Sequence, residues 1–285
     1  MPCPVQRRIL LAAWLASLAT PAAALAQGGL PAERIEYAAW LAESPISPMA
    51  AVAHRTVGRG LTIGPAGSDI PAPGLATHRL TVASGAARLE GPDGRRALPF
   101  GRPVAVGRLT LLLASARGST WVTVFDASVA RKSTSHFPPA PALSFVGPLV
   151  PAARRATAQM LTLDGIVVEA EEAGQVRLPM AGDTVSLAVR RVPDPASGEV
   201  ELTVYFQDAT NGDGTYPSGR FVTLDPLADG RYRLDFNRAR NPFCAYSSAY
   251  PCPVPWPGNR VDARIEAGER YGAAGAPGAP AAPAR

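Results

Sequence analysis

The sequence predicts an all-β protein, a mainly antiparallel sandwich or barrel, with one short N-terminal helix. After Pro48 the chain consists of short runs rich in β-branched and aromatic residues, separated by Gly, Pro and Asp. Several separators are explicit turns, among them Asp164-Gly165, Asp229-Gly230 and the Gly-Pro-Asp-Gly run at 91–94. These residues supply the positive φ values that hairpins need. Many short strands with close turn signals favour an antiparallel architecture and leave sandwich versus barrel open.

The first 26 residues have the three zones of a cleavable export signal. Arg7 and Arg8 precede an apolar run at 9–18, and Ala24-Leu25-Ala26 is a small-x-small cleavage site. The run is shorter than the roughly 20 residues that cross a bilayer, so no membrane span is expected. Gln27 rather than Cys follows the site, so no lipid anchor is expected either. We therefore predict that residues 1–26 are removed and that the protein is exported, periplasmic or secreted.

The remaining 259 residues are predicted to form one β-rich domain at 27–271, followed by a disordered tail at 272–285 made of Gly, Ala, Pro and Arg. Removal of Arg7 and Arg8 lowers the net charge from +5 to +3, and the basic residues are scattered along the chain. A nucleic-acid partner is excluded on these grounds, because such proteins cluster their basic residues on one face.

The helix is predicted at 33–43, where good helix formers follow Pro31 and place Ile35, Ala39 and Ala42 on one face. Strands are predicted at 77–82, 109–114, 121–126, 159–163, 166–170, 184–191, 202–206, 221–224 and 231–235.

Alternating apolar residues allow two hairpins to be registered. Pairing Arg191 with Val200 sets Val185, Leu187 and Val189 opposite Phe206, Val204 and Leu202. Pairing Leu224 with Arg231 sets Phe221 opposite Leu234, and it also sets Arg220 directly opposite Asp235. We expect that charge pair to be buried beneath the loop at 241–259.

From Phe206 onward the chain resembles the bacterial and archaeal domain of unknown function 1684 family. The matching positions are Asp208, Thr210, Thr215-Tyr216, Gly219-Arg220, Asp235-Phe236-Asn237, Asn241-Pro242, Cys244-Ala245-Tyr246, Cys252-Pro253, Asn259 and Ala267-Gly268-Glu269. A weaker likeness at Arg117-Gly118, Asp126 and the helix around Trp40 extends the resemblance to most of 34–271. The chain departs from the family at 48–57, which lacks tryptophan, and at Arg240, where Tyr is frequent. The resemblance implies no particular activity.

Cys244 and Cys252 are the two cysteines that remain after export, and seven residues separate them. In an oxidising compartment such a pair favours a disulfide, which removes about 2.5 kcal/mol of unfolded-chain entropy. Zinc is disfavoured, because His54, His78 and His136 are isolated in sequence. No metal or other cofactor is predicted.

The segment 241–259 holds five prolines, both cysteines and four aromatic residues, so it is predicted to be an ordered irregular loop. It either covers a sheet edge or forms the wall of a binding pocket. The run 208–214 resembles a calcium loop, but its spacing would place Arg220 at the acidic position, which favours a hairpin turn.

No nucleophile elbow, phosphate loop or zinc-protease motif occurs in the sequence, and His136 is interpreted as a loop or surface residue. What remains is a set of polar candidate ligand-binding residues: Asp208, Tyr216, Arg220, Asp235, Asn237, Asn241, Tyr246, Asn259 and Glu269. They form either a site or a mutually satisfied buried network, and the network is favoured.

Two functions remain open. The first is an exported non-enzymatic domain that binds a small ligand, for example an anion, or an envelope protein. The alternative is a periplasmic hydrolase in which Asp208, Asp235 or Glu269 acts as acid or base and Arg220 holds an anion.

Overall fold

A computed structural model describes residues 21–180, 182–193, 199–254 and 256–272 of the chain. Within these residues the chain forms three sheets, which are mostly antiparallel, and one α-helix, so the predicted all-β class is confirmed. Most of the predicted export signal, 1–20, and the tail from 273 onward lie outside the described residues. None of the described helices is long and apolar enough to span a membrane.

The helix α1 (Pro21–Glu43) is longer than predicted and is broken at Gly29, whose φ of 65° and ψ of 174° are not helical. Its second segment contains the predicted helix. The predicted apolar face is wrong, because Ile35 is 70% exposed while Leu41 is buried. The packed face instead carries Tyr37 and Trp40, whose rings stack 5.6 Å apart.

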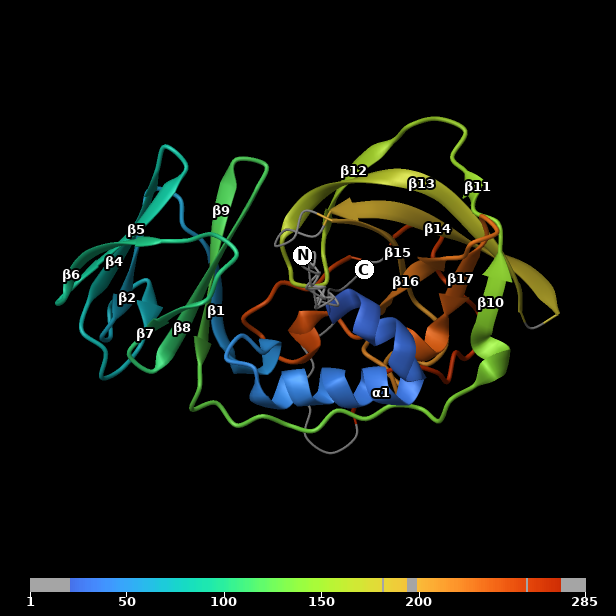
Figure 1. The fold of residues 1–285 in the computed structure, drawn as a ribbon, viewed down its shortest axis with the longest axis horizontal. Helices are drawn as coiled ribbons and strands as arrows, with labels where there is room; N and C mark the ends of the chain where they lie inside the picture. The colour runs from blue at the N-terminus through green and yellow to red at the C-terminus, as the bar shows by residue number, and fades with distance from the viewer. Residues whose placement is uncertain (1–20, 181, 194–198, 255, 273–285) are drawn as a thin grey trace, which may run out of the picture.

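The N-terminal lobe is a sandwich of two small sheets (Figure 1). The four-stranded sheet has the order β1 (Ala51–Thr56), β9 (Ser119–Asp126), β8 (Leu109–Ala116) and β7 (Val104–Val106). The five-stranded sheet has the order β3 (Ile70–Pro71), β2 (Leu61–Gly64), β4 (His78–Ala83), β5 (Ala86–Gly91) and β6 (Gly94–Leu98). Alternate residues of β8, namely Leu109, Leu111 and Leu113, are buried in the core between the sheets, as period-two alternation requires.

The C-terminal lobe is built on one eight-stranded sheet that curves into a half-barrel (Figure 1). Its order is β10 (Ser144–Gly147), β17 (Tyr232–Asp235), β16 (Arg220–Pro226), β15 (Val200–Phe206), β14 (Asp183–Pro193), β13 (Val167–Met180) and β11 (Val150–Pro151), and β12 (Thr157–Leu161) also pairs with β13. A bulge at Gly174 bends β13 where it meets β11. This residue has a φ of 146°, and a Cβ there would collide with the Val150 carbonyl, so glycine is required.

The segment after the irregular loop, residues 259–271, lies against the half-barrel. Val261, Ile265 and Ala267 are buried in the same core as Val204 and Phe206 of β15. Backbone hydrogen bonds join Gln207 to Asn259 and Val261, and Ala209 to Ala263. This segment therefore closes the core of the half-barrel.

The loop 241–259 lies between the two lobes, and its described part contains only a short 3-10 turn (Phe243–Ala245) as regular structure. Tyr250 and Cys244 pack in one cluster with Ala51 and Phe125 of the N-terminal lobe. Trp256 packs in another with Tyr205, and Trp121 of β9 borders it. The aromatic residues of the loop therefore join the lobes.

Both predicted hairpin registers are wrong. Arg191 pairs with Leu202 rather than Val200, a shift of two residues that keeps the apolar face. Leu224 pairs with Leu234 rather than Arg231, a shift of three residues. The ladder continues two residues beyond Leu224, to the pair Pro226 and Tyr232, and the Leu227 N–H donates to the Arg231 carbonyl. The turn therefore lies further along the chain than predicted.

Candidate functional site

The predicted charge pair between Arg220 and Asp235 does not exist. Arg220 lies opposite Phe206 of β15, while Asp235 lies opposite Ser144 of β10. The expected burial of Arg220 is correct, because its exposed fraction is 0%. Its actual carboxylate partner is Asp208, with 2.7 Å between Nη2 and Oδ2.

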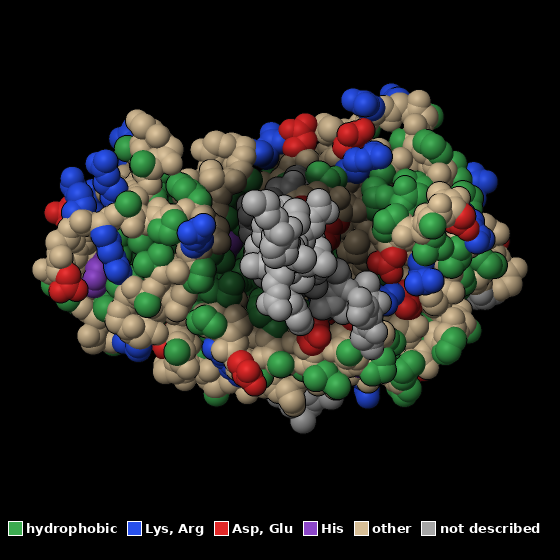
Figure 2. Space-filling view, in the orientation of Figure 1, with side chains coloured by type: hydrophobic (Ala, Val, Ile, Leu, Met, Phe, Trp, Pro, Cys, Tyr) green, Lys and Arg blue, Asp and Glu red, His purple; other side chains and the backbone are tan. Residues whose placement is uncertain are grey.

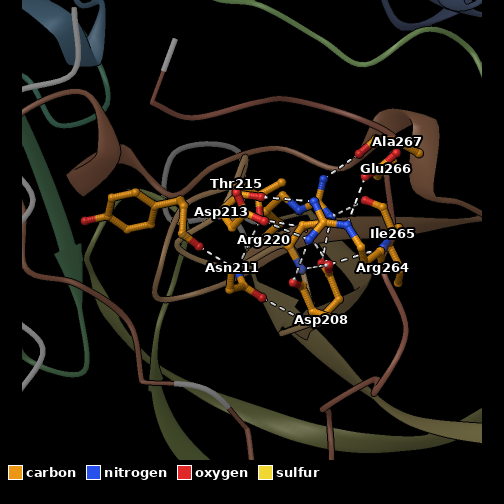
Figure 3. Close-up of polar contacts among 12 residues, drawn as sticks. Asp208, Asn211, Asp213, Thr215, Arg220, Arg264, Ile265, Glu266 and Ala267 are labelled. Carbon is orange, nitrogen blue, oxygen red and sulfur yellow. Dashed lines mark hydrogen bonds and ion pairs between the residues drawn. The ribbon is translucent and has the colours of Figure 1, made fainter.

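The two terminal nitrogens of the Arg220 guanidinium donate to protein atoms, while its buried Nε has no partner among the described residues (Figure 3). Besides Asp208, it donates to the carbonyls of Ile265, at 2.9 Å, and Ala267. Burial lowers the pKa of Arg220, and the Asp208 carboxylate opposes that shift. The arginine therefore binds the closing segment to the half-barrel and is not free to hold a ligand anion.

The other oxygen of Asp208 organises the turn before β16. Asp208 Oδ1 accepts from the Thr210 backbone N–H at 2.7 Å, from the Thr210 hydroxyl at 2.5 Å and from Ile265 N–H at 3.2 Å. Asn211 in turn accepts from Asp208 N–H at 2.6 Å. The acidic and amide side chains of 208–214 thus make turn hydrogen bonds, as the spacing predicts. Arg264, bonded to Asp213 at 2.9 Å, closes the exposed side of this turn (Figure 3).

Glu269 is the centre of a second buried group. Its side chain accepts from Asn241 N–H at 2.9 Å and from the Tyr246 hydroxyl at 2.5 Å. The Tyr37 hydroxyl of α1 lies 3.4 Å from that of Tyr246. Burial raises the pKa of Glu269 to about 7, although the hydrogen bond from Tyr246 and the charges of Arg240 and Arg220 oppose the shift.

The side chains of Asn237, Asn259 and Asp235 form hydrogen bonds with backbone groups. Asn237 both donates to and accepts from Ala140, and Asn259 does the same with Ala188. Asp235 accepts from the backbone N–H of Asn237 at 3.0 Å, which caps a short 3-10 turn. These contacts attach loops to strands and leave little capacity for a ligand.

Tyr216 lies beside the two cysteines, both of which are free thiols in the structure. The predicted disulfide is therefore not formed, although the two thiols interact with each other. The Tyr216 hydroxyl lies 3.2 Å from Cys252 Sγ. Cys244 is buried and Cys252 is exposed.

A small hollow lies between α1 and the segment 237–240, and its lining includes Arg34, Tyr37, His136 and Arg240. Arg34 donates to the carbonyls of Phe137 and Asn237, and its buried Nε has no partner among the described residues. Arg240 lies 4.1 Å above the Tyr37 ring. Burial and the charges of both arginines lower the pKa of His136 to about 4.

Of the residues that line this hollow, Asn237 alone was among the ligand-binding candidates predicted from the sequence. Arg34, His136 and Arg240 are far apart in the chain and belong to no motif. Only the packing of α1 on the half-barrel brings them together. Glu33 of α1 secures this packing with two contacts to Arg238, at 2.7 and 2.8 Å.

The protein is β-rich, with a sandwich lobe and a half-barrel lobe. Most of its candidate ligand-binding residues are buried. Residues 130–270 match the family described as Protein of unknown function (DUF1684), and over these residues the chain belongs to that family. The match is narrower than the 34–271 expected from sequence and contains the half-barrel. Figure 2 shows one face of the molecule, with this lobe on the right and the sandwich lobe on the left.

A comparison with curated proteins found no match. Among solved structures, the chain is similar to an uncharacterised protein of Haloarcula marismortui determined by solution NMR. The sequence identity is 28%, the TM-score is 0.41, and the match covers 49% of this chain and 77% of the other.

Proposed function

We propose that this protein is an exported, non-enzymatic binding protein that takes a small anion in the hollow between α1 and residues 237–240. The observation that supports a non-enzymatic role is the burial of the proposed anion holder and of two of the three acid or base candidates. The third candidate, Asp235, is partly exposed and caps a short 3-10 turn. Arg220 and Glu269 are fully buried, and Asp208 is nearly so. Each is bonded to protein atoms, whereas a hydrolytic base must reach substrate or water.

The hollow favours an anion because two of the arginines that line it form no close ion pair, although the Glu33 carboxylate also lines it. Among the described residues neither Arg34 nor Arg240 forms an ion pair within 4.0 Å, whereas the neighbouring Arg238 is paired with Glu33. Burial is the main cause of the low pKa of His136, and the positive charges of those two arginines lower this pKa further. The positions of their guanidinium groups leave donors available for an oxyanion or halide.

The size of the hollow limits the ligand. Its volume is about 20 Å³. Since one water needs about 10–15 Å³ by this measure, the hollow takes one or two water-sized groups. The ligand is therefore a halide, or a short carboxylate such as acetate that adds little beyond its carboxyl group.

Export is part of the proposal and is compatible with the contacts of α1. Cleavage after Ala26 would leave intact the helical segment beyond Gly29, which carries Glu33, Arg34 and Tyr37. The intact mass of the protein recovered from its host envelope tests this step. A product that retains residues 1–26 would contradict it.

Thermal melts with sodium acetate or chloride test the hollow, with the bulky anion gluconate at equal ionic strength as the size control. At ten times the dissociation constant a small anion stabilises the folded state by about 1.4 kcal/mol, which raises Tm by about 3 to 6 °C. The double variant Arg34→Gln/Arg240→Gln should lose this rise. Arg95→Gln, which changes an exposed arginine of β6, should retain it.

An equal rise with gluconate, or a rise that survives in the double variant, would contradict anion binding in the hollow. Native mass spectrometry of the protein purified from its own envelope identifies a retained ligand or partner. The alternative of a hydrolase has one supporting feature, the pKa of Glu269 near 7, which suits a general acid or base. Hydrolysis of generic ester substrates that Glu269→Gln abolishes would favour that alternative.

A further inference from the structure

We propose that Cys252 is a reactive thiol and Cys244 its resolving partner, so that the pair undergoes thiol–disulfide exchange with a disulfide-bearing molecule. The site lies in the loop 241–259, at the junction of the two lobes. It is separate from the arginine-lined hollow and does not depend on the proposed anion binding.

The two cysteines differ in exposure and therefore have different roles in the exchange. Cys252 is exposed, so an external disulfide can reach its sulfur. Cys244 is 7% exposed and belongs to the cluster that joins the lobes, together with Ala51, Phe125 and Tyr250. A small external disulfide therefore meets Cys252 first, and Cys244 can react only with a sulfur already beside it.

Tyr216 provides the polar contact that a thiolate needs. Its hydroxyl lies 3.2 Å from Cys252 Sγ, while its ring is 2% exposed. The backbone around it is fixed, because Asn211 Nδ2 donates to the Tyr216 carbonyl at 2.5 Å and Gly219 N–H donates to the same atom at 3.1 Å. Burial raises the pKa of Tyr216, so its hydroxyl keeps its proton and donates to the sulfur.

The pKa values of the two thiols are shifted in opposite directions, as the exchange requires. The hydrogen bond from Cys244, aided by that from Tyr216, lowers the pKa of Cys252 to about 6, against the effect of burial. Interaction with Cys252 and burial raise the pKa of Cys244. The thiolate is the nucleophile in such reactions, so the accessible sulfur is also the activated one.

The exchange balances with a disulfide R–S–S–R as the oxidant. The Cys252 thiolate attacks one sulfur of R–S–S–R, the S–S bond breaks, and the electron pair leaves with the other sulfur as a thiolate. Cys244 then gives its proton to solvent and attacks Cys252 Sγ, which forms the Cys244–Cys252 disulfide and expels the second R–S⁻. Two cysteine thiols are oxidised, and one disulfide is reduced to two thiols.

Oxidised glutathione is the probe, applied to the reduced full-length protein at pH 7 and followed by acid quench and peptide mapping. Wild-type protein should form the internal disulfide without a lasting adduct. Cys244→Ser, which keeps a hydrogen-bond donor, should trap one glutathionyl group on Cys252. Cys252→Ser should leave Cys244 unmodified. Tyr216→Phe in the Cys244→Ser background should slow adduct formation several-fold at pH 7 and move the midpoint of its pH profile upward.

Three results would overturn the proposal. One is glutathionylation of Cys244 in the Cys252→Ser variant at the same rate as glutathionylation of Cys252 in the Cys244→Ser variant. Another is a Cys244–Cys252 disulfide that reduced glutathione cannot open while the protein is folded, since that bond would be structural only. The third is an unchanged rate and pH profile in Tyr216→Phe, with near-UV circular dichroism showing that each variant is folded.

Discussion

Replacing Arg220 by alanine tests the buried pair on which the closing segment depends. The change removes the 2.7 Å contact to Asp208 and the donors to the carbonyls of Ile265 and Ala267. Asp208 would keep a charge whose side chain is 1% exposed. Breaking one side of a buried ion pair costs about 3 to 5 kcal/mol. For a protein of this size we expect a fall in Tm of about 6 to 20 °C.

A double-mutant cycle assigns the partner. Arg220→Ala, Asp208→Ala and the double variant are compared by urea unfolding, and the double variant should lose about 1 to 3 kcal/mol less than the sum of the single losses. Asp235→Ala is the matched control, because Asp235 lies on β17 opposite Ser144, and its effect should add to that of Arg220→Ala. Strong coupling to Asp235 with none to Asp208 would refute the register and the assignment of the pair.

Two further stability predictions follow from Glu269 and from the turn beside it. The folded-state pKa of Glu269, about 7, is above its ordinary value of 4.5, so its burial should lower stability as pH rises from about 4.5 to 7, by about 3 kcal/mol in total. Urea unfolding at pH 4 and pH 8 should show this loss in wild type and not in Glu269→Gln, and equal pH profiles would contradict it. Gly268→Ala should destabilise by several kcal/mol, since φ is 75° and a Cβ would lie 2.6 Å from the Ala239 carbonyl oxygen. Gly230→Ala, with a φ of 79° and open space around it, should cost only about 1 to 2 kcal/mol in the same urea unfolding experiment. Equal losses in the two variants would show that the clash of Gly268→Ala with the Ala239 carbonyl is relieved.

Much of the strand pattern was predictable from local sequence. The nine predicted strands all correspond to strands of the structure, because β-branched runs between Gly, Pro and Asp turns have few other conformations. The strands β1, β2, β3, β7, β10 and β11 were not predicted. The hairpin β5–β6 was also missed, although its turn at 91–94 was predicted. Its strands carry Arg88, Arg95 and Arg96, so their apolar alternation is weak in the sequence. The strands form because Ala87 and Leu89 are buried in the core of the sandwich.

The sequence by itself determined the β class, the turns and which polar residues deserved attention. Only the tertiary structure decided the partners of those residues. Asp208 lies 12 residues before Arg220 and was available as a partner in the sequence, but the alternation rule favoured Asp235 on a hairpin whose turn lies further along the chain than expected. The carbonyls that complete the Arg220 contacts belong to residues 265 and 267 of the closing segment. Glu269 of the same segment accepts hydrogen bonds from Asn241 and Tyr246. Local propensity cannot place a closing segment, because its position depends on the apolar surface that Val261, Ile265 and Ala267 bury against the finished half-barrel.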